Sequence, residues 1–258
     1  MKAPAFNRHG VTAIFKHEMA RFSRSIVQSI LTPVITTTLY FVVFGSAIGS
    51  RMNRVEGVDY GAFIVPGLIM LTVLVESLTN GSFGIQMQKM TGTIYELLSA
   101  PISAVESVSA YVGAAALKSV ILGLLILVTA TFFVPIKILH PVWMTAFLIM
   151  TSLTFCLFGF ILGILCKGWE QLWIVPGLVI TPLTFLGGAF YSIDMLPAGW
   201  RTVALFNPVV YLVSGFRWSF FGAADVPVSV SLAATAGIFM VCLGIVIWIF
   251  RTGYRLKN

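Results

Sequence analysis

Residues 186–217 read LGGAFYSIDMLPAGWRTVALFNPVVYLVSGFR, and this stretch decides how many times the chain can cross a membrane. It is apolar, but Gly187, Gly188, Pro197, Gly199 and Pro208 interrupt it. Asn207 followed by Pro208 is a helix-start signal, with asparagine as the N-cap and proline in the first turn. Pro197 can begin an earlier helix that ends near Phe206. The pattern therefore predicts two short helices.

Neither helix is long enough to cross a bilayer. At 1.5 Å per residue they measure roughly 15 Å and 22 Å, against a hydrocarbon core of about 30 Å. A crossing by residues 208–224 would also put the basic C-terminal tail outside, against the positive-inside rule. The stretch is therefore predicted to enter the membrane from outside and return as a re-entrant helical hairpin. Backbone at such a turn must be buried in protein or line a watery cavity.

Outside this stretch the chain consists mostly of long apolar runs. Of its 258 residues, 58% are hydrophobic and 10% are charged, whereas about a quarter of a soluble domain is charged. Each run reaches the roughly 20 residues that a spanning helix needs. The predicted fold is an all-α integral membrane protein, a single transmembrane domain over 1–258 with no separate soluble core. Its six transmembrane helices are predicted at residues 26–49, 62–85, 107–134, 142–166, 172–193 and 229–250.

Positive charge gathers at the two ends of the chain. The six-span prediction puts ten of the sixteen lysines and arginines on one side, chiefly in residues 1–25 and 251–258. Both termini are therefore expected to be cytoplasmic. The net charge of +7 is explained by orientation in the membrane and contact with lipid headgroups, and needs no nucleic acid partner. Residues 10–26 place apolar and basic side chains on opposite helix faces, which predicts an amphipathic helix along the membrane surface, or else a solvated flank.

Cysteine and histidine positions give no sign of a metal site. Cys156, Cys166 and Cys242 lie inside or at the ends of apolar spans without paired spacing, which is typical of small buried hydrophobic residues. The histidines are scattered in flanks and one loop. No cleaved signal peptide is expected, because the first apolar run follows 25 polar-rich residues and is longer than a signal h-region.

Two charged residues, Glu76 and Lys118, fall inside predicted spans. Glu76 lies nine residues before its span ends at Ile85, and Lys118 lies eleven residues after its span begins at Ser107, so their depths match within one turn. A lone charge at mid-membrane costs about 2.5 to 3.5 kcal/mol. The two side chains are therefore predicted to face each other or a water-filled cavity. A structural ion pair and a role in substrate or proton handling both remain open.

Close helix contacts are predicted where glycines recur at G-x-x-x-G spacing. The pairs are Gly45 with Gly49 and Gly159 with Gly163. Glycine at this spacing lets two helix backbones approach each other. Packing within the chain is favoured, and dimerisation is the alternative.

The loop between the second and third spans contains a short helix in the sequence GTIYELLSAP, residues 92–101. Gly92 and Pro101 bracket it, and Thr93 and Glu96 have the T-x-x-E spacing of a capping box. Its apolar side is formed by Ile94, Leu97 and Leu98. Leucines displayed on a cytoplasmic loop suggest docking into another protein, and a helix resting on the bilayer surface explains these residues equally well.

The run PLTFLGGAFYS at 182–192, followed by NPVVYL at 207–212, makes the chain similar to type 2 ATP-binding-cassette export permeases. The N-terminal helix, six spans and loop helix fit as well, so the resemblance covers essentially the whole chain. Members include permeases for drugs, lipo-oligosaccharides and lipid-linked polysaccharides. The resemblance implies that two copies of this permease pair with two separate ATPase subunits in a bacterial inner membrane.

The resemblance also implies roles for particular segments. The loop helix would couple to the ATPase through Thr93, Ile94, Glu96, Leu97 and Leu98, and the turn at 167–171, with Lys167 and Glu170, would be a second contact. The N-terminal helix would be an interface element. Substrate would pass between the two copies, near the first, second and fifth spans and beneath the outer hairpins.

ATP and Mg²⁺ are expected on the partner subunit, so this chain is predicted to be a transport subunit and not an enzyme. It has no Gly-Lys dipeptide and therefore no phosphate loop of the G-x-x-x-x-G-K-[ST] type. An ion-coupled carrier that uses Glu76 is the alternative function, although no clear internal repeat supports it. An intramembrane enzyme would need clustered His, Asp or Cys residues within spans.

Overall fold

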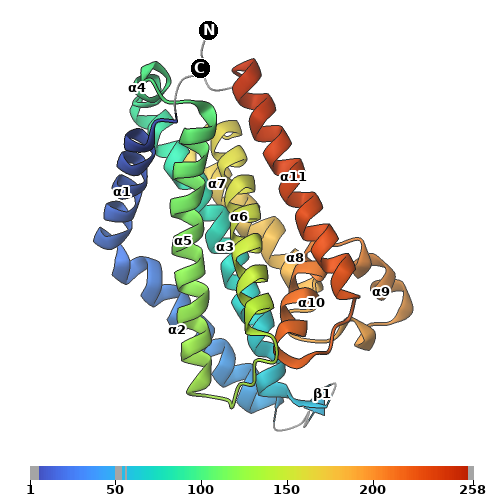
Figure 1. Ribbon diagram of the computed structural model, residues 1–258. Helices are drawn as coiled ribbons and strands as arrows, with labels where there is room; N and C mark the ends of the chain where they lie inside the picture. Colours follow the sequence, from blue (N-terminus) through green and yellow to red (C-terminus); the bar gives the residue numbers. More distant parts are fainter. Residues whose placement is uncertain (1–5, 50–53, 56, 255–258) are drawn as a thin grey trace.

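The computed structural model describes residues 6–49, 54–55 and 57–254 as a helical bundle with one small β-hairpin (Figure 1). Six helical segments in these residues are long and apolar enough to cross a membrane: Val27–Gly45, Tyr60–Thr91, Ala104–Thr131, Pro141–Leu165, Trp169–Leu186 and Val228–Thr252. Each overlaps one predicted span, so the predicted fold class is confirmed. Lys2, Arg51, Arg255 and Lys257, part of the charge argument, lie outside the described residues.

The first and fifth spans are composite helices. In the first, π-helical segments η1 (Val27–Leu31) and η2 (Phe41–Ile48) flank α2 (Thr32–Tyr40). In the fifth, the π-helical η3 (Val175–Ile180) separates α7 (Trp169–Ile174) from α8 (Thr181–Leu186). Within the described residues, π-helical segments occur only in these two spans. Such segments are rare and are often found at functional sites.

The remaining elements are regular. They are α1 (Arg8–Arg24), β1 (Arg54–Val55), β2 (Val58–Asp59), α3 (Tyr60–Thr91), α4 (Ile94–Ser99), α5 (Ala104–Thr131), α6 (Pro141–Leu165), η4 (Ile193–Met195), α9 (Ala198–Leu205), α10 (Pro208–Phe221) and α11 (Val228–Thr252). The two strands pair antiparallel, with Arg54 opposite Asp59. The fifth span ends at Leu186, earlier than predicted, because Gly187 and Gly188 interrupt the helix and Gly188 adopts a φ of +79°.

Helix α3 is the centre of the bundle. In an 18-residue apolar stretch of each span, 83% is buried for α3, whereas only 17%, 22% and 22% is buried for the first, fifth and sixth spans. The tightest neighbour of α3 is α6. A Cβ atom on Gly159 would lie 2.1 Å from the Leu78 carbonyl oxygen, and one on Gly163 would lie 2.6 Å from that of Ser82. This G-x-x-x-G pair therefore packs within the chain. Gly45 has no such neighbour within 4 Å.

The bundle has two distinct ends. At the upper end in Figure 1, α1 begins, α11 ends and α4 lies over the helices. We call this the α4 end. The β-hairpin marks the opposite end, and α9 and α10 belong to that half of the molecule (Figure 1). Because the chain crosses an even number of times, α1 begins at the end where α11 finishes.

Candidate functional site

Helix α4 is present where the sequence predicts it, but the predicted capping box between Thr93 and Glu96 is absent. Thr93 is the N-cap residue, yet its side chain makes no capping hydrogen bond. Instead its hydroxyl donates to the Gln88 side-chain oxygen. An N-cap side chain reaches the first turn from an extended backbone, whereas Thr93 is helical, with φ −68° and ψ −8°. The helix therefore begins without this cap.

The same sequence signal forms a real capping box one helix later, at the start of α5. The Ser103 amide donates to Glu106 Oε2 at 2.6 Å, and the Glu106 amide donates to Ser103 Oγ at 3.3 Å. The other carboxylate oxygen, Oε1, accepts from the Asn7 amide at 2.5 Å. Glu106 thus closes the start of α5 and also holds the start of α1 against it.

The apolar side of α4 faces the bundle and not the outside. Ile94 is 3% exposed and belongs to a core cluster, and Leu97 packs against the same cluster. Ile94 is therefore not available for contact with another protein, whereas Leu97 is half-buried and its predicted display stays a prediction. The Leu98 side chain lies outside the described residues. The outward face carries Tyr95, 52% exposed, together with the exposed Glu96.

The predicted second contact lies on a turn at the end of α6. Lys167 and Glu170 are both exposed there, and the Lys167 amide donates to Gln171 Oε1 at 2.9 Å. Lys89, near the end of α3, donates to the Ile164 carbonyl at 2.5 Å and to the Cys166 carbonyl at 3.2 Å. This ammonium caps the last carbonyls of α6. The helix ends that carry α4 and the 167–171 turn are therefore tied together.

A cavity of about 620 Å³ opens between α1, the first span, α3 and the fifth span. Glu76 and Lys118 both line it, as one of the two predicted arrangements requires. They are not an ion pair with each other: Glu76 accepts from Asn80 Nδ2 at 3.4 Å, and Lys118 pairs with Glu18. The full lining is Arg21, Phe22, Arg24, Ser25, Gln28, Ser29, Thr32, Pro33, Val75, Glu76, Thr79, Asn80, Phe83, Lys118 and Trp173.

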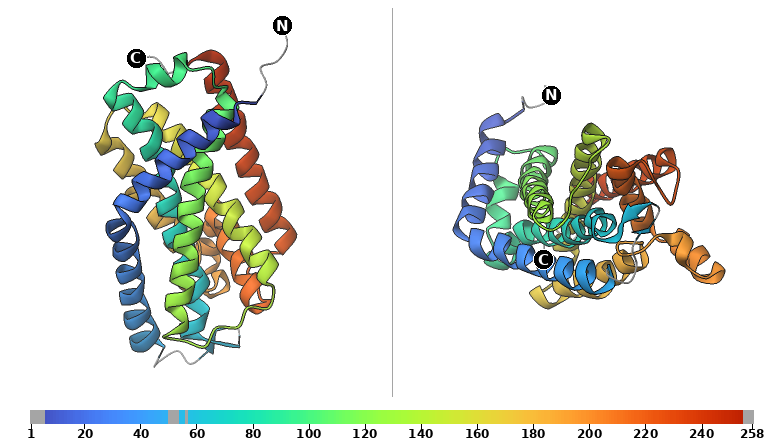
Figure 2. Two further views of the ribbon diagram at one scale, coloured as in Figure 1. Left: turned by 60° about the vertical axis from the view of Figure 1, so that its left-hand side comes forward. Right: turned by 90° about the horizontal axis from the view of Figure 1, so that it is seen from below.

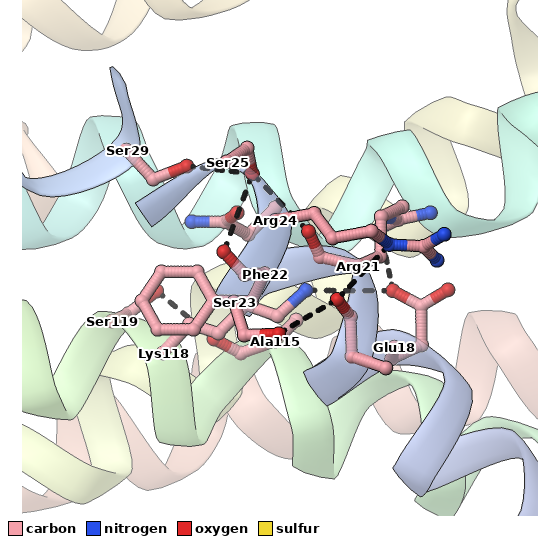
Figure 3. A network of polar contacts seen from close by, with 12 residues as sticks. Glu18, Arg21, Phe22, Ser23, Arg24, Ser25, Ser29, Ala115, Lys118 and Ser119 are labelled. Atoms are coloured by element: carbon pink, nitrogen blue, oxygen red, sulfur yellow. Dashed lines mark hydrogen bonds and ion pairs between the residues drawn. The ribbon is translucent and has the colours of Figure 1, made fainter. Parts of the chain in front are cut away.

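Glu18 is a buried carboxylate that contacts Arg21 and Lys118, two residues of the cavity lining (Figure 3). Its Oε2 atom lies 2.5 Å from Arg21 Nη2 and 3.5 Å from Lys118 Nζ, and its side chain is 3% exposed. The Arg21 guanidinium also lies 4.6 Å from the centroid of the Phe83 ring, within cation–π distance. The Glu18 carboxylate thus contacts two cations, and these contacts offset part of the free-energy cost of burying its negative charge.

Helix α1 is set against α5 by two contacts in matching register. Asn7 bonds Glu106 and Glu18 bonds Lys118, so the contacts are spaced alike along both helices. Figure 2 (left) shows α1, in dark blue, slanting across α5. A helix is therefore present where the sequence predicts one, but its most buried residue is acidic, and its place along the membrane surface stays a prediction. The sequence offers one indication of the role of Glu18, because it is the sole acidic residue before position 56.

The hairpin after the fifth span has the two short helices that the sequence predicts. Pro197 directly precedes α9, and Asn207 caps α10, accepting from the Val209 amide at 3.0 Å with Pro208 at the first position. Asn207 Nδ2 also donates to the Leu183 carbonyl at 2.5 Å. Helix α10 packs against α3, α6 and α11 and is not among the segments able to span.

A buried arginine holds this hairpin. Arg217 on α10 is fully buried, and its Nη1 lies 2.7 Å from Asp225 Oδ2. Nη2 donates to the Gly188 carbonyl, and the guanidinium lies 4.2 Å from the Phe63 ring centroid on α3. Asp225 accepts further from Ser192 Oγ at 2.5 Å and from the Ile193 amide at 3.0 Å.

Backbone contact fixes the hairpin to α3 as well. A Cβ atom on Gly67 would lie 1.8 Å from the Ala189 carbonyl oxygen, so only glycine allows this approach. The predicted glycine pair Gly187 and Gly188 turns the chain here, and both residues are buried. In the described part of the chain, no three His, Cys, Asp or Glu side chains gather as they would around a metal ion.

Six spans, a short helix at one end and a helical hairpin at the other define a multi-pass membrane permease. The chain belongs to the ABC-2 type transporter family, which matches residues 9–221. It is similar to the inner membrane transport permease YadH of Escherichia coli K12, with 38% identity over 247 residues, 95% of this chain and 96% of that protein. It is also similar to nodulation protein J of Rhizobium leguminosarum bv. viciae, with 24% identity over 212 residues, 81% of this chain and 82% of that protein. The same protein of Rhizobium leguminosarum bv. trifolii has 25% identity over 248 residues, 95% of this chain and 92% of that protein.

These matches confirm the family resemblance seen in the sequence. The chain is a membrane transport protein, and the naming of its relatives as permeases is consistent with a transport subunit and not an enzyme.

Proposed function

We propose that this chain is the membrane subunit of a bacterial inner-membrane exporter driven by a separate ATPase. Two copies would combine with two ATPase subunits, which carry the ATP and Mg²⁺, and move an amphipathic or hydrophobic substrate outward. The observation that carries this proposal is the 620 Å³ cavity, because it is lined by the first, second and fifth spans.

The lining of this cavity suits an amphipathic molecule. Its volume lies within the roughly 300 to 1,000 Å³ of ligand pockets. Arg24 and Lys118 supply charge, while Phe22, Phe83 and Trp173 supply aromatic surface. Drugs, lipids and sugar-lipid conjugates share this combination of a polar part and an apolar part.

A second copy would cover the outward faces of the first and fifth spans. Ile35 and Leu39 on α2 are 49% and 58% exposed, and Leu178 on η3 is 72% exposed. These spans flank the cavity, so pairing two copies there would enclose a path between them. Their π-helical segments support the idea of spans that change shape during transport.

The ATPase would dock at the α4 end, which we propose is cytoplasmic. Tyr95 and Met90, each 52% exposed, and the exposed turn with Lys167 and Glu170 form the available surface. Basic residues Arg8 and Arg24 on α1 and Arg251 on α11 support the cytoplasmic assignment of both termini.

Co-purification with a co-expressed ATPase tests the proposal. Tyr95→Asp should reduce the recovered ATPase, and the transport-coupled ATP hydrolysis, by tenfold or more if Tyr95 is an interface hot spot of about 2 kcal/mol. Phe206→Asp is the matched control, because Phe206 is 86% exposed but lies between α9 and α10, at the other end. Equal ATPase recovery for the two variants would contradict the docking site. Transport by this chain without any ATPase would contradict the function.

An ion-coupled carrier is the second candidate, favoured by the position of Glu76 in the cavity lining. It predicts transport driven by a proton gradient alone and abolished by Glu76→Gln. Under the exporter proposal, ATP-driven transport survives this substitution. Reconstituted vesicles with either ATP or a proton gradient distinguish the two.

A further inference from the structure

A second cavity, of about 630 Å³, lies between α5, α6 and α11. Helix α11 packs against α6 and α10 but meets α5 at few positions. A groove therefore remains between α5 and α11, with Leu153 and Leu157 of α6 also lining it. On α5 the groove is lined by Gly113, beside which a Cβ atom would meet nothing within 4 Å. We call this space the α5–α11 groove.

The α5–α11 groove is apolar except at one end. Of its lining residues only Ser109 and Arg251 have polar side chains, and the Ser109 hydroxyl already donates to the Glu106 carbonyl at 2.9 Å. Arg251 is exposed in the last turn of α11 and forms no ion pair with any residue that the structure describes. A cation at the mouth of an apolar groove complements an amphiphile with an anionic head.

The groove is open toward the surroundings of the bundle. Val105 and Ile247, on its two sides, are 68% and 41% exposed. Its lining on α11 runs from Phe239 to Arg251, which is about 18 Å along a helix. One leaflet is half of a hydrocarbon core of about 30 Å. The groove therefore extends over about the depth of one leaflet from the α4 end.

We propose that the α5–α11 groove binds an anionic phospholipid, with one acyl chain between the two helices and the phosphate at Arg251. Guanidinium groups bind phosphate oxygens through charge-assisted, often bidentate hydrogen bonds. The apolar lining of the groove suits an acyl chain, the length of the groove is close to the depth of one leaflet, and the positive charge of Arg251 complements an anionic headgroup. The site is separate from the polar cavity, which the first, second and fifth spans line.

The position of the groove favours lipid over a second copy of this chain. Seen from below in Figure 2 (right), the first span, in blue, and the fifth span, in gold, lie on one side of α3. Helices α5, α6 and α11 lie on the other side (Figure 2). A second copy paired across the first and fifth spans would leave this side facing the bilayer.

Native mass spectrometry of the purified full-length protein tests the headgroup. Dioleoyl phosphatidylglycerol and dioleoyl phosphatidylcholine are titrated separately, so that only the head differs. The wild type should retain one phosphatidylglycerol per chain more tightly than phosphatidylcholine. Arg251→Gln should lower the phosphatidylglycerol affinity roughly fivefold, the effect of about one charge at a membrane surface, whereas Arg251→Lys should retain most of it. Equal affinities for both lipids in the wild type would overturn the proposal.

A pair of glycine substitutions tests the location. Gly113→Phe should fill the groove and remove the retained lipid, and replacing a helix-interior glycine does not weaken helix propensity. Gly237→Phe on α11 is the matched control, because Gly237 is exposed, has open space around it and is not in the groove lining. Wild-type lipid binding by Gly113→Phe would overturn the proposal. So would a loss of dimer, with lipid binding unchanged, in that variant.

Discussion

Replacing Arg217 with glutamine should loosen the hairpin that follows the fifth span. The arginine side chain is 0% exposed and Asp225 is 3% exposed, with 2.7 Å between their charged atoms. Glutamine is shorter and neutral, so it cannot replace the contacts to both Asp225 and the Gly188 carbonyl. The Asp225 carboxylate would keep only its bonds from Ser192 and Ile193. A buried charge would then lack its counterion.

Removing one partner of a buried ion pair costs about 3 to 5 kcal/mol. On a scale of about 2 to 4 °C per kcal/mol for chains of this size, the unfolding temperature should fall by roughly 6 to 20 °C. The measurement is thermal unfolding of the purified protein in detergent, followed by tryptophan fluorescence. Six tryptophans contribute to this signal, and two of them, Trp200 and Trp218, lie in the hairpin.

Arg201→Gln is the matched control in the same hairpin. Arg201 pairs with Asp194 at 2.6 Å, but the two side chains are 52% and 59% exposed. An exposed pair contributes about 0 to 1 kcal/mol, so this variant should melt within roughly 4 °C of the wild type. Adding Asp225→Asn to Arg217→Gln should recover part of the loss, because no buried charge remains. If Arg217→Gln melts no lower than Arg201→Gln, the reasoning about this buried pair is refuted.

Two further predictions concern helix packing. Gly159→Ala should destabilise the α3–α6 contact by about 1 to 3 kcal/mol, because its Cβ would lie 2.1 Å from a backbone oxygen. Gly244→Ala is the control: this residue lies in open space, so the substitution should not lower the melting temperature. Equal melting temperatures for the two variants would contradict the contact. Lys118→Met should make α1 more susceptible to limited proteolysis and lower the free energy of unfolding by about 1 to 3 kcal/mol, a moderate loss because Glu18 still pairs with Arg21. Lys16→Met, at an exposed position, is the control. If α1 is cleaved no faster than in that control, the Lys118–Glu18 contact does not hold α1 in place.

The sequence was sufficient for features that depend on local chemistry. Long uncharged runs predict spans because a bilayer admits few other structures, and Asn207 before Pro208 predicts the start of α10 because both residues act on the adjacent turn. The spacing of a Ser or Thr to a following Glu does not by itself show which of two sites forms a capping box. Thr93 and Ser103 share the spacing to a glutamate, but only Ser103 has an extended backbone, with ψ 158°.

Long-range partners could not be read from the sequence. Matching depths within the spans predict that Lys118 faces Glu76 or shares a cavity with it, but they give no information on Glu18, which lies outside the spans. Likewise, the spacing of Ile94 and Leu97 shows that α4 has one apolar face. It cannot show whether that face is covered by the same chain or by a partner. The structure assigns it to the chain's own core.

Under the proposed docking at the α4 end, the two bonds from Lys89 to the last carbonyls of α6 would carry force between these helices. Together with the glycine contacts along α3 and α6, they join the second and fourth spans into one stiff unit with α4 at its tip. A push on α4 would therefore tilt both helices as a lever. The compliance needed to open and close a path would fall to the loosely wound first and fifth spans beside it.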